Sequence, residues 1–335
     1  MKAFFRLLSL FLTALLVLSF TACDLSFVKD ALDEAPDDGD FTPPTFTEVT
    51  ATEFGDTYGD QLSPNEKAIY DAILATEVGK NEFAVTLPEA LTLCKGRAPT
   101  EEEQESAKEK LTFWISNAVF AAWLDAPTLF WLDFGDYSYS CTFKQNGEGI
   151  VGVVDLTVTV ALRTDAQTAA RRTTALNARA DALLSDLPGG ASDAETVRAI
   201  NSLLCDAVEY DLNAPDRGTA AGALVDGKCV CEGYARAFQL LCEKAGISAV
   251  CILGKAKSNG ETEGHMWNAV RIDGAWYYCD PTWNDTTASE KYLLVGGNTM
   301  GHEGTFDKTH FPENTLGKSK PFALPDVSRT AYGEN

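Results

Sequence analysis

The spacing of apolar and polar positions predicts a chain in which helices and strands are mixed. Capping boxes, in which Ser or Thr is followed three residues later by Glu, open three predicted helices, at Ser63, Thr100 and Ser192. Residues 154–162 alternate apolar with polar side chains, as a half-buried strand does, and the Asn-Gly pair at 146–147 is a hairpin signal. Together with an Ala- and Arg-rich helix expected over residues 166–184, this pattern predicts an α+β fold.

The first 22 residues have the layout of an export signal. Lys2 and Arg6 precede an almost entirely apolar stretch over residues 7–20, and small residues then lead to Cys23. The stretch is too short for an ordinary membrane span. Because the segment ends in Cys, it resembles a bacterial lipoprotein signal, in which Cys23 is acylated after cleavage. We expect an exported protein held by lipid on the outer face of the bacterial cytoplasmic membrane, with a plain secretory peptide as the alternative.

Residues 23–62 have the composition of an acidic, disordered tether. Lys29 is the only basic side chain in this stretch, which includes the acidic run at residues 37–40. Such a segment buries too little apolar surface to offset its ordering entropy, and its like charges repel one another. The whole chain of 335 residues has a formal charge of −22, which repels phosphate backbones and argues against nucleic acid as a partner.

Two folded domains are predicted beyond the tether. Residues 63–187 form an N-terminal α+β domain in which we find no chemical motif. The helix that begins at Ser192 and a Pro-Gly-Gly sequence at 188–190 place the boundary near residue 188. Residues 188–335 then form a second domain with a C-terminal extension.

Cys231 is the first candidate for chemistry. A Gly-containing segment leads to it, and apolar residues follow it at helical spacing, which places Cys231 in the first turn of a helix. The free N–H groups and the dipole at a helix N-terminus favour a thiolate, the form that attacks a carbonyl carbon. Cys229 is the rival nucleophile, and for either residue simple packing is the alternative.

His265 and Asp280 complete a possible triad. Asp273-Gly274 is a preferred two-residue hairpin turn, and with that turn Asp280 lies across from Trp267 and diagonal to His265 on one sheet face. A carboxylate that accepts a hydrogen bond from one imidazole nitrogen leaves the other nitrogen free as a base. A slip of one residue in the hairpin would separate the two side chains.

Three sequence blocks carry a family resemblance. Cys231-Glu232-Gly233-Tyr234-Ala235, His265-Met266-Trp267-Asn268 and the block that runs from Asp280 to Asp285 resemble the signature blocks of the transglutaminase-like superfamily. The resemblance covers about residues 190–300. It implies a papain-like core with a nucleophile helix packed on an antiparallel sheet. It also implies that Cys231 is the nucleophile, His265 the general base and acid, and Asp280 the orienting carboxylate.

Other residues have weaker functional interpretations. Pocket or substrate contacts are expected at four positions: Tyr234, Trp267, Asn268 and Trp283. His302 and His310 lack metal-ligand spacing and are interpreted as solvated loop residues. Three cysteines at apolar positions are expected to be buried free thiols, namely Cys205, Cys242 and Cys251. No cofactor or metal is expected, since no calcium-binding loop is evident.

The predicted function is that of a cell-surface cysteine enzyme that acts on amide bonds of proteins or peptides through a thioester. Hydrolysis, as in a protease or amidase, is favoured because water outcompetes an amine at an exposed site. A protein-glutamine γ-glutamyltransferase, which cross-links proteins, is the first alternative. A non-catalytic binding or scaffold module is the second.

Overall fold

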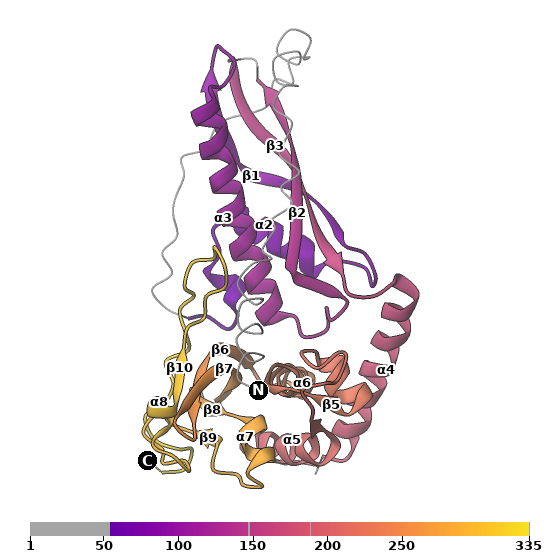
Figure 1. Cartoon of the computed structure of the whole chain (residues 1–335), viewed down its shortest axis with the longest axis vertical. Coiled ribbons are helices and arrows are strands. Elements are labelled where there is room, and N and C mark those ends of the chain that lie inside the picture. Colours follow the sequence, from indigo (N-terminus) through magenta and orange to yellow (C-terminus); the bar gives the residue numbers. More distant parts are fainter. Residues whose placement is uncertain (1–53, 147, 188, 335) are drawn as a thin grey trace, which may run out of the picture.

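The computed structural model describes residues 54–146, 148–187 and 189–334. The predicted signal at residues 1–22, the lipidation site Cys23 and most of the predicted tether lie outside the described residues. The described chain forms an upper body, residues 54–165, and a lower body, residues 166–334 (Figure 1).

The upper body is a three-stranded antiparallel sheet with two helices against it. Its elements are the 3₁₀ turn η1 (Tyr58–Gln61), helices α2 (Pro64–Leu74) and α3 (Glu101–Asp125), and strands β1 (Glu82–Lys95), β2 (Leu132–Gln145) and β3 (Ile150–Leu162). The strand order is β1-β3-β2. Strand β1 was not predicted, although its first residues alternate in burial as a half-exposed strand does.

The lower body is a five-stranded antiparallel sheet with helices packed on it. Its helical elements are α4 (Ala166–Ser185), α5 (Asp193–Ala207), η2 (Gly222–Asp226), α6 (Cys231–Lys244), α7 (Pro281–Thr286) and α8 (Phe306–Thr309). Its strands are β4 (Glu209–Tyr210), β5 (Lys228–Cys229), β6 (Ala249–Ser258), β7 (Glu261–Ile272), β8 (Ala275–Cys279), β9 (Leu293–Val295) and β10 (His310–Pro312). The order in the large sheet is β10-β6-β7-β8-β9, and α6 packs against β6 and β7. The predicted α+β class is therefore confirmed, with the helix that begins at Cys231 packed on an antiparallel sheet.

The hairpin register on which the predicted triad depends is also confirmed. Ile272 pairs with Ala275 and Asn268 with Cys279, so the turn contains Asp273 and Gly274 alone. Asp273 has a φ of 52° and Gly274 a φ of 83°, the left-handed conformations that a type I′ turn requires and that Asp-Gly supplies at low cost.

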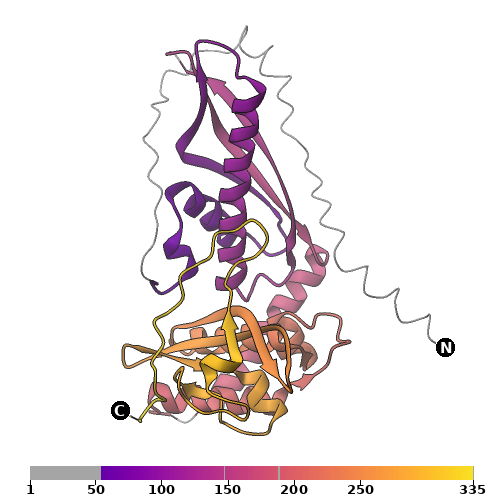
Figure 2. The ribbon, with the colours of Figure 1, turned by 60° about the vertical axis from the view of Figure 1, so that its left-hand side comes forward.

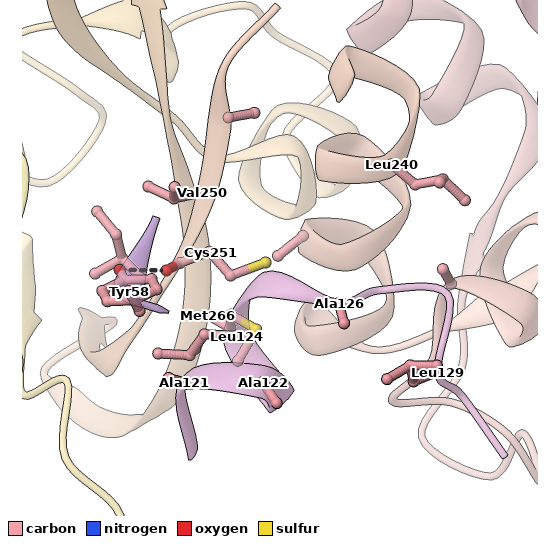
Figure 3. Packing of buried hydrophobic residues seen from close by; sticks show 14 of the residues in the cluster. Tyr58, Ala121, Ala122, Leu124, Ala126, Leu129, Leu240, Val250, Cys251 and Met266 are labelled. Carbon is pink, nitrogen blue, oxygen red and sulfur yellow. Dashed lines mark hydrogen bonds between the residues drawn. The ribbon is translucent and has the colours of Figure 1, made fainter. Parts of the chain in front are cut away.

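The two bodies share one hydrophobic core. The C-terminal turn of α3 lies on β6 and contributes Ala121, Ala122 and Leu124 to the contact (Figure 3). Tyr58 of η1 is fully buried beside them, and its hydroxyl donates a hydrogen bond of 2.7 Å to the Cys251 carbonyl of β6. Residues that are 193 positions apart thus fix one body on the other.

The C-terminal segment returns from the lower sheet to the upper body, where it runs past α3 (Figure 2). The Lys320 N–H donates to Asn117 Oδ1 of α3 at 2.8 Å, and the Ala323 N–H donates to Gln61 Oε1 at 2.7 Å. The ring of Phe322 lies edge-on to Tyr58, with ring centroids 6.0 Å apart. The extension is therefore part of the contact between the bodies.

Folded structure begins earlier than predicted. We placed the end of the tether at residue 62, yet Tyr58 and Gln61 are buried. The acidic composition around them misled the prediction, because one aromatic ring and one capped turn are enough to fix this segment. The domain boundary near residue 188 stays a prediction, although α4, on its N-terminal side, packs against α5, α6 and η2. None of the helices in the described ranges combines the length and apolar character that a bilayer crossing needs.

Replacing Tyr58 with Phe should lower the free energy of unfolding by about 1–3 kcal/mol, because a buried carbonyl loses its hydrogen-bond donor. Urea denaturation of the full chain measures the change. Tyr210→Phe, which alters a tyrosine that is 39% exposed, is the control and should cost less than about 0.5 kcal/mol. Equal stability of both variants would contradict the assignment of Tyr58 as a link between the bodies.

Candidate functional site

Cys231 occupies the first position of α6, as predicted. Val230 is the extended N-cap residue, and Cys231 N–H is one of the donors that a helix N-terminus leaves without an intrahelical acceptor. Gly233 explains how α6 can begin here, since a Cβ at this position would lie 2.6 Å from the Arg217 carbonyl oxygen and 2.4 Å from Cys229 Cβ. The glycine of the first block therefore lets the helix start pack closely on the loop before it.

His265 and Asp280 meet as the hairpin register requires. His265 is on β7, and Asp280 follows β8 as the N-cap residue of α7. The distance from His265 Nε2 to Asp280 Oδ2 is 2.7 Å. The Cys231 side chain also acts on the His265 ring, and since Nε2 faces Asp280, Nδ1 is the nitrogen that is left for it.

Asn268 connects the helix of Cys231 to the strand of His265. Its Nδ2 donates to the Ala235 carbonyl of α6 at 3.0 Å and to the Val250 carbonyl of β6 at 3.3 Å. These two bonds fix α6 against the sheet one helical turn after Cys231. The Asn of the second block is thus a structural link between two of the site's elements.

Asp280 is buried with none of its surface exposed, and both of its oxygens accept hydrogen bonds. Oδ1 accepts the Trp283 N–H at 3.0 Å, which caps α7, while Oδ2 faces two imidazoles. Burial acts to raise the pKa of this carboxyl group, but the charge of His265 and the imidazole hydrogen bonds hold the pKa well below its usual range. Asp280 is therefore a carboxylate at neutral pH.

His265 is an imidazolium at neutral pH. Burial acts to lower its pKa, but the charge of Asp280 and the hydrogen bonds to Asp280 and Cys231 outweigh burial and raise the pKa to about 10. Cys231 and this imidazolium line the same cleft. The arrangement suits a nucleophilic sulfur with a proton donor beside it.

A cleft of about 300 Å³ opens over Cys231 and His265. Its wall includes Trp283, the phenol ring of Tyr210, and two exposed acidic residues of β7, Glu261 and Glu263. These two are the charged side chains of the cleft apart from the triad residues, and both precede His265 on one face of the strand. We had not predicted them, although counting back by two from His265 would have found them.

Of the four residues expected to contact substrate, Trp283 alone lines the cleft. Tyr234, Trp267 and Asn268 are completely buried, so the pocket role expected for them is corrected. The Tyr234 hydroxyl is hydrogen-bonded to the Val208 carbonyl and to the Asp285 carboxylate. These contacts hold α6 to the segment after α5 and to α7. Trp267 stacks behind the His265 ring, with centroids 5.9 Å apart, so it supports the imidazole from the core side.

The prediction for His310 was wrong, and that for His302 was right. His302 is exposed. His310 is only 3% exposed, and its Nε2 lies 3.1 Å from Asp280 Oδ2. Its surroundings come from pairing of β10 with β6, a contact between distant segments that the local Gly- and Pro-rich sequence does not indicate.

All eight cysteines in the described ranges are free thiols. Cys229, the rival nucleophile, is fully buried, and burial raises the pKa of its thiol well above the ordinary value. Cys242 and Cys251 are buried as predicted, whereas Cys205 is half-buried. Cys231 is the cysteine that reaches the cleft.

The arrangement of His265, Asp280 and His310 resembles a metal-ligand set. One potential ligand atom of each lies within 4.8 Å of the others. The distances from the two Nε2 atoms to Asp280 Oδ2, 2.7 and 3.1 Å, are hydrogen-bond distances, so shared protons account for the geometry. We therefore describe this group as a hydrogen-bonded network.

Comparisons with known proteins agree with the resemblance. The family model described as transglutaminase-like superfamily matches residues 181–281, a range that contains Cys231, His265 and Asp280. Kyphoscoliosis peptidase of Mus musculus is 36% identical over 151 residues, which are 39% of this chain and 23% of that protein. The Homo sapiens protein of the same name is 35% identical over 153 residues, which are 40% of this chain and 23% of that protein.

Among solved structures, the periplasmic domain of TgpA from Pseudomonas aeruginosa is 19% identical, with a TM-score of 0.27 over 45% of this chain and 64% of that chain. The present chain spans less than a quarter of the length of the curated relatives that it matches. Residues 181–281, which lie in the lower body, are thus similar in sequence to the transglutaminase-like superfamily.

Proposed function

We propose that this chain is a cysteine enzyme that cleaves amide bonds of proteins or peptides, with Cys231 as nucleophile, His265 as general acid and base, and Asp280 as the orienting carboxylate. The observation that carries the proposal is that Cys231 and His265 line one cleft, with His265 Nε2 2.7 Å from Asp280 Oδ2. A protein that only binds its partner has no need of an ionised His265–Asp280 pair beside a cysteine.

In the first half of the proposed reaction, the Cys231 thiolate attacks the substrate carbonyl and forms a C–S bond. The Cys231 N–H is at the start of α6, where it can donate a hydrogen bond to the oxyanion, and the helix dipole favours that charge. His265 then transfers its Nδ1 proton to the leaving nitrogen, the C–N bond breaks, and a thioester and a free amine result.

In the second half, His265 takes a proton from the attacking acceptor, the C–S bond breaks, and the Cys231 thiolate is regenerated. Water as acceptor gives a carboxylic acid, and an amine gives a new amide. Most residues of the cleft wall are exposed to solvent, so water has free access to the thioester. This openness favours hydrolysis, the activity of a protease or amidase.

Transamidation is the second candidate, because the acidic residues of the cleft would bring a cationic acceptor to the site. Glu261 and Glu263 would attract a lysine ammonium toward the thioester. The same carboxylates would also attract a basic side chain of a peptide that is to be cleaved. The two candidates therefore share a preference for cationic partners and differ in the acceptor.

The place of action is also part of the proposal. The segment up to Cys23, which lies outside the described residues, suggests an exported lipoprotein at the outer face of the bacterial cytoplasmic membrane. Cell-surface proteins or peptides are then the substrate class.

Iodoacetamide should alkylate Cys231 before any other described cysteine at pH 7, because an imidazolium stabilises its thiolate while burial raises the pKa of several other thiols. His265→Ala should slow this alkylation about tenfold or more. Peptide mapping by mass spectrometry gives the rate for each cysteine.

His302→Ala, which removes an exposed imidazole, is the matched control and should leave the Cys231 rate unchanged. If Cys231 reacted no faster than Cys205 or Cys141, or if His265→Ala had no effect, the triad assignment would be refuted.

Incubation with a glutamine-containing protein and a fluorescent primary amine should release ammonia or peptide fragments without amine incorporation, since water reaches the thioester freely. Cys231→Ala should abolish the release. Incorporation of the amine that depends on Cys231 would replace hydrolysis with transamidation as the activity.

Peptides with Lys near the scissile bond should be cleaved faster than matched peptides with Glu, because the cleft wall is acidic. Glu263→Gln should reduce kcat/KM for the Lys peptide about threefold, as expected for a partly screened ion pair, with little change for the Glu peptide. Glu77→Gln, at an exposed position of the upper body, is the control for the change in net charge. An equal loss with both peptides would exclude charge recognition.

A further inference from the structure

Asp280 has a second imidazole partner that the proposed triad does not use. His310 Nε2 lies 3.1 Å from the same Oδ2 atom that faces His265 Nε2 at 2.7 Å. His310 belongs to β10, 30 positions after Asp280, and lies beyond the residues that match the family model. Nothing in the three sequence blocks indicates it.

Aromatic rings enclose His310 and fix its orientation. The Phe306 ring is stacked on it with centroids 3.8 Å apart and planes at 8°, and the rings of Trp283 and Trp267 lie at 4.5 and 5.1 Å. The pairing of His310 with Ala256 fixes the backbone at the edge of the large sheet. The imidazole therefore has one available direction for Nε2, which is toward Asp280.

The hydrogen-bond partners define which nitrogen carries the proton. A carboxylate oxygen accepts only, so Nε2 must donate to Asp280. Nδ1 lies 3.0 Å from the Thr309 hydroxyl, which in this tautomer donates to Nδ1 instead of to the Phe306 carbonyl at 3.1 Å. Burial lowers the pKa of His310, against the opposing effect of Asp280. Besides Asp280, the titratable groups around the ring are His265 of β7 and Tyr292, which precedes β9. His310 is therefore a neutral donor at pH 7.

We propose that His310 is a positioning residue that extends the triad to a Cys231–His265–Asp280–His310 series. Its Nε2–H holds Asp280 Oδ2 in the orientation that His265 requires and takes up part of the carboxylate charge. The orientation of Asp280 matters for catalysis only if the proposed function holds, so the inference rests on that function. The hydrogen bond between His310 and Asp280 can itself be observed without substrate.

The effect of His310 on His265 has a definite sign. The carboxylate is a stronger hydrogen-bond acceptor for His310 when His265 is neutral than when His265 carries a positive charge. His310 therefore favours the neutral form of His265 and limits how far Asp280 raises its pKa. Removal of the His310 donor should move the His265 titration to higher pH.

The chain has only three histidines, so ¹⁵N-histidine NMR of the full chain can test the proposal. The unmodified protein should show His310 protonated at Nε2 at pH 7, and His265 should titrate near pH 10. In His310→Phe the His265 titration should shift upward by about half a pH unit or more.

His310→Gln, whose Nε2 can donate from nearly the same position, should bring the His265 titration most of the way back. His302→Gln is the matched control and should leave the His265 titration unchanged. Thermal unfolding and circular dichroism show whether His310→Phe is folded. If it is not, the His310→Gln variant and the NMR of the unmodified protein test the role of His310.

An unprotonated His310 Nε2, or a His265 titration that is the same in His310→Phe as in the unmodified protein, would overturn the inference. The proposed function would fail in a different way, with an unmodified protein in which His265 titrates at an ordinary pH and Cys231 reacts like the other thiols.

Discussion

A carboxylate enclosed by protein can stay ionised only if other groups on the inside compensate its charge, and Asp280 is such a group. Its donors come from α7, β7 and β10, which are separate in the sequence and converge on two oxygen atoms. Each donor fixes one element relative to the others. The hydrogen bonds to the Asp280 carboxylate therefore tie together the β7–β8 hairpin, the short helix α7 and the edge strand β10.

The same requirement extends to α6, the helix that begins at Cys231. Asn268 joins β7 to α6, so the orientation of His265 and the position of Cys231 are not independent. Arg236, the residue after Ala235 in α6, donates to the Trp123 carbonyl at 2.6 Å and lies over the Trp123 ring at 4.5 Å. Because Trp123 is near the end of α3, the upper body contacts the helix that begins with Cys231. This body has no chemical motif of its own, but it supports the site from behind.

Much of the site could be predicted because its geometry is local. The Asp273-Gly274 turn fixed the register, and the register fixed the meeting of His265 with Asp280. The Gly-rich entry to α6 placed Cys231 at a helix start in the same way. These inferences need only neighbours in the sequence and the periods of a helix and a strand.

His310 could not be predicted on these grounds, because a strand of three residues carries no periodic signal and its partner β6 is far away in the sequence. Tyr58 was missed for a related reason, since its acidic surroundings hide a contact that forms only when η1 reaches β6. The buried positions of Trp267 and Asn268 likewise depend on the packing of α6 on the sheet. Long-range packing decided each of these cases.

The acidic wall of the cleft bears on the choice between water and an amine. Glu263 and Glu261 precede His265 by two and four residues on one strand face, so their Cα atoms are about 7 and 13 Å from that of His265. A lysine held by either carboxylate is within reach of the thioester, but the ion pair keeps its nitrogen protonated and therefore not nucleophilic. To act as an acceptor, the amine would have to leave the carboxylate and give up its proton inside a cleft that water also enters. The wall is thus better suited to hold a cationic substrate than to activate an amine, and for this reason the charge of the cleft and its openness both favour hydrolysis.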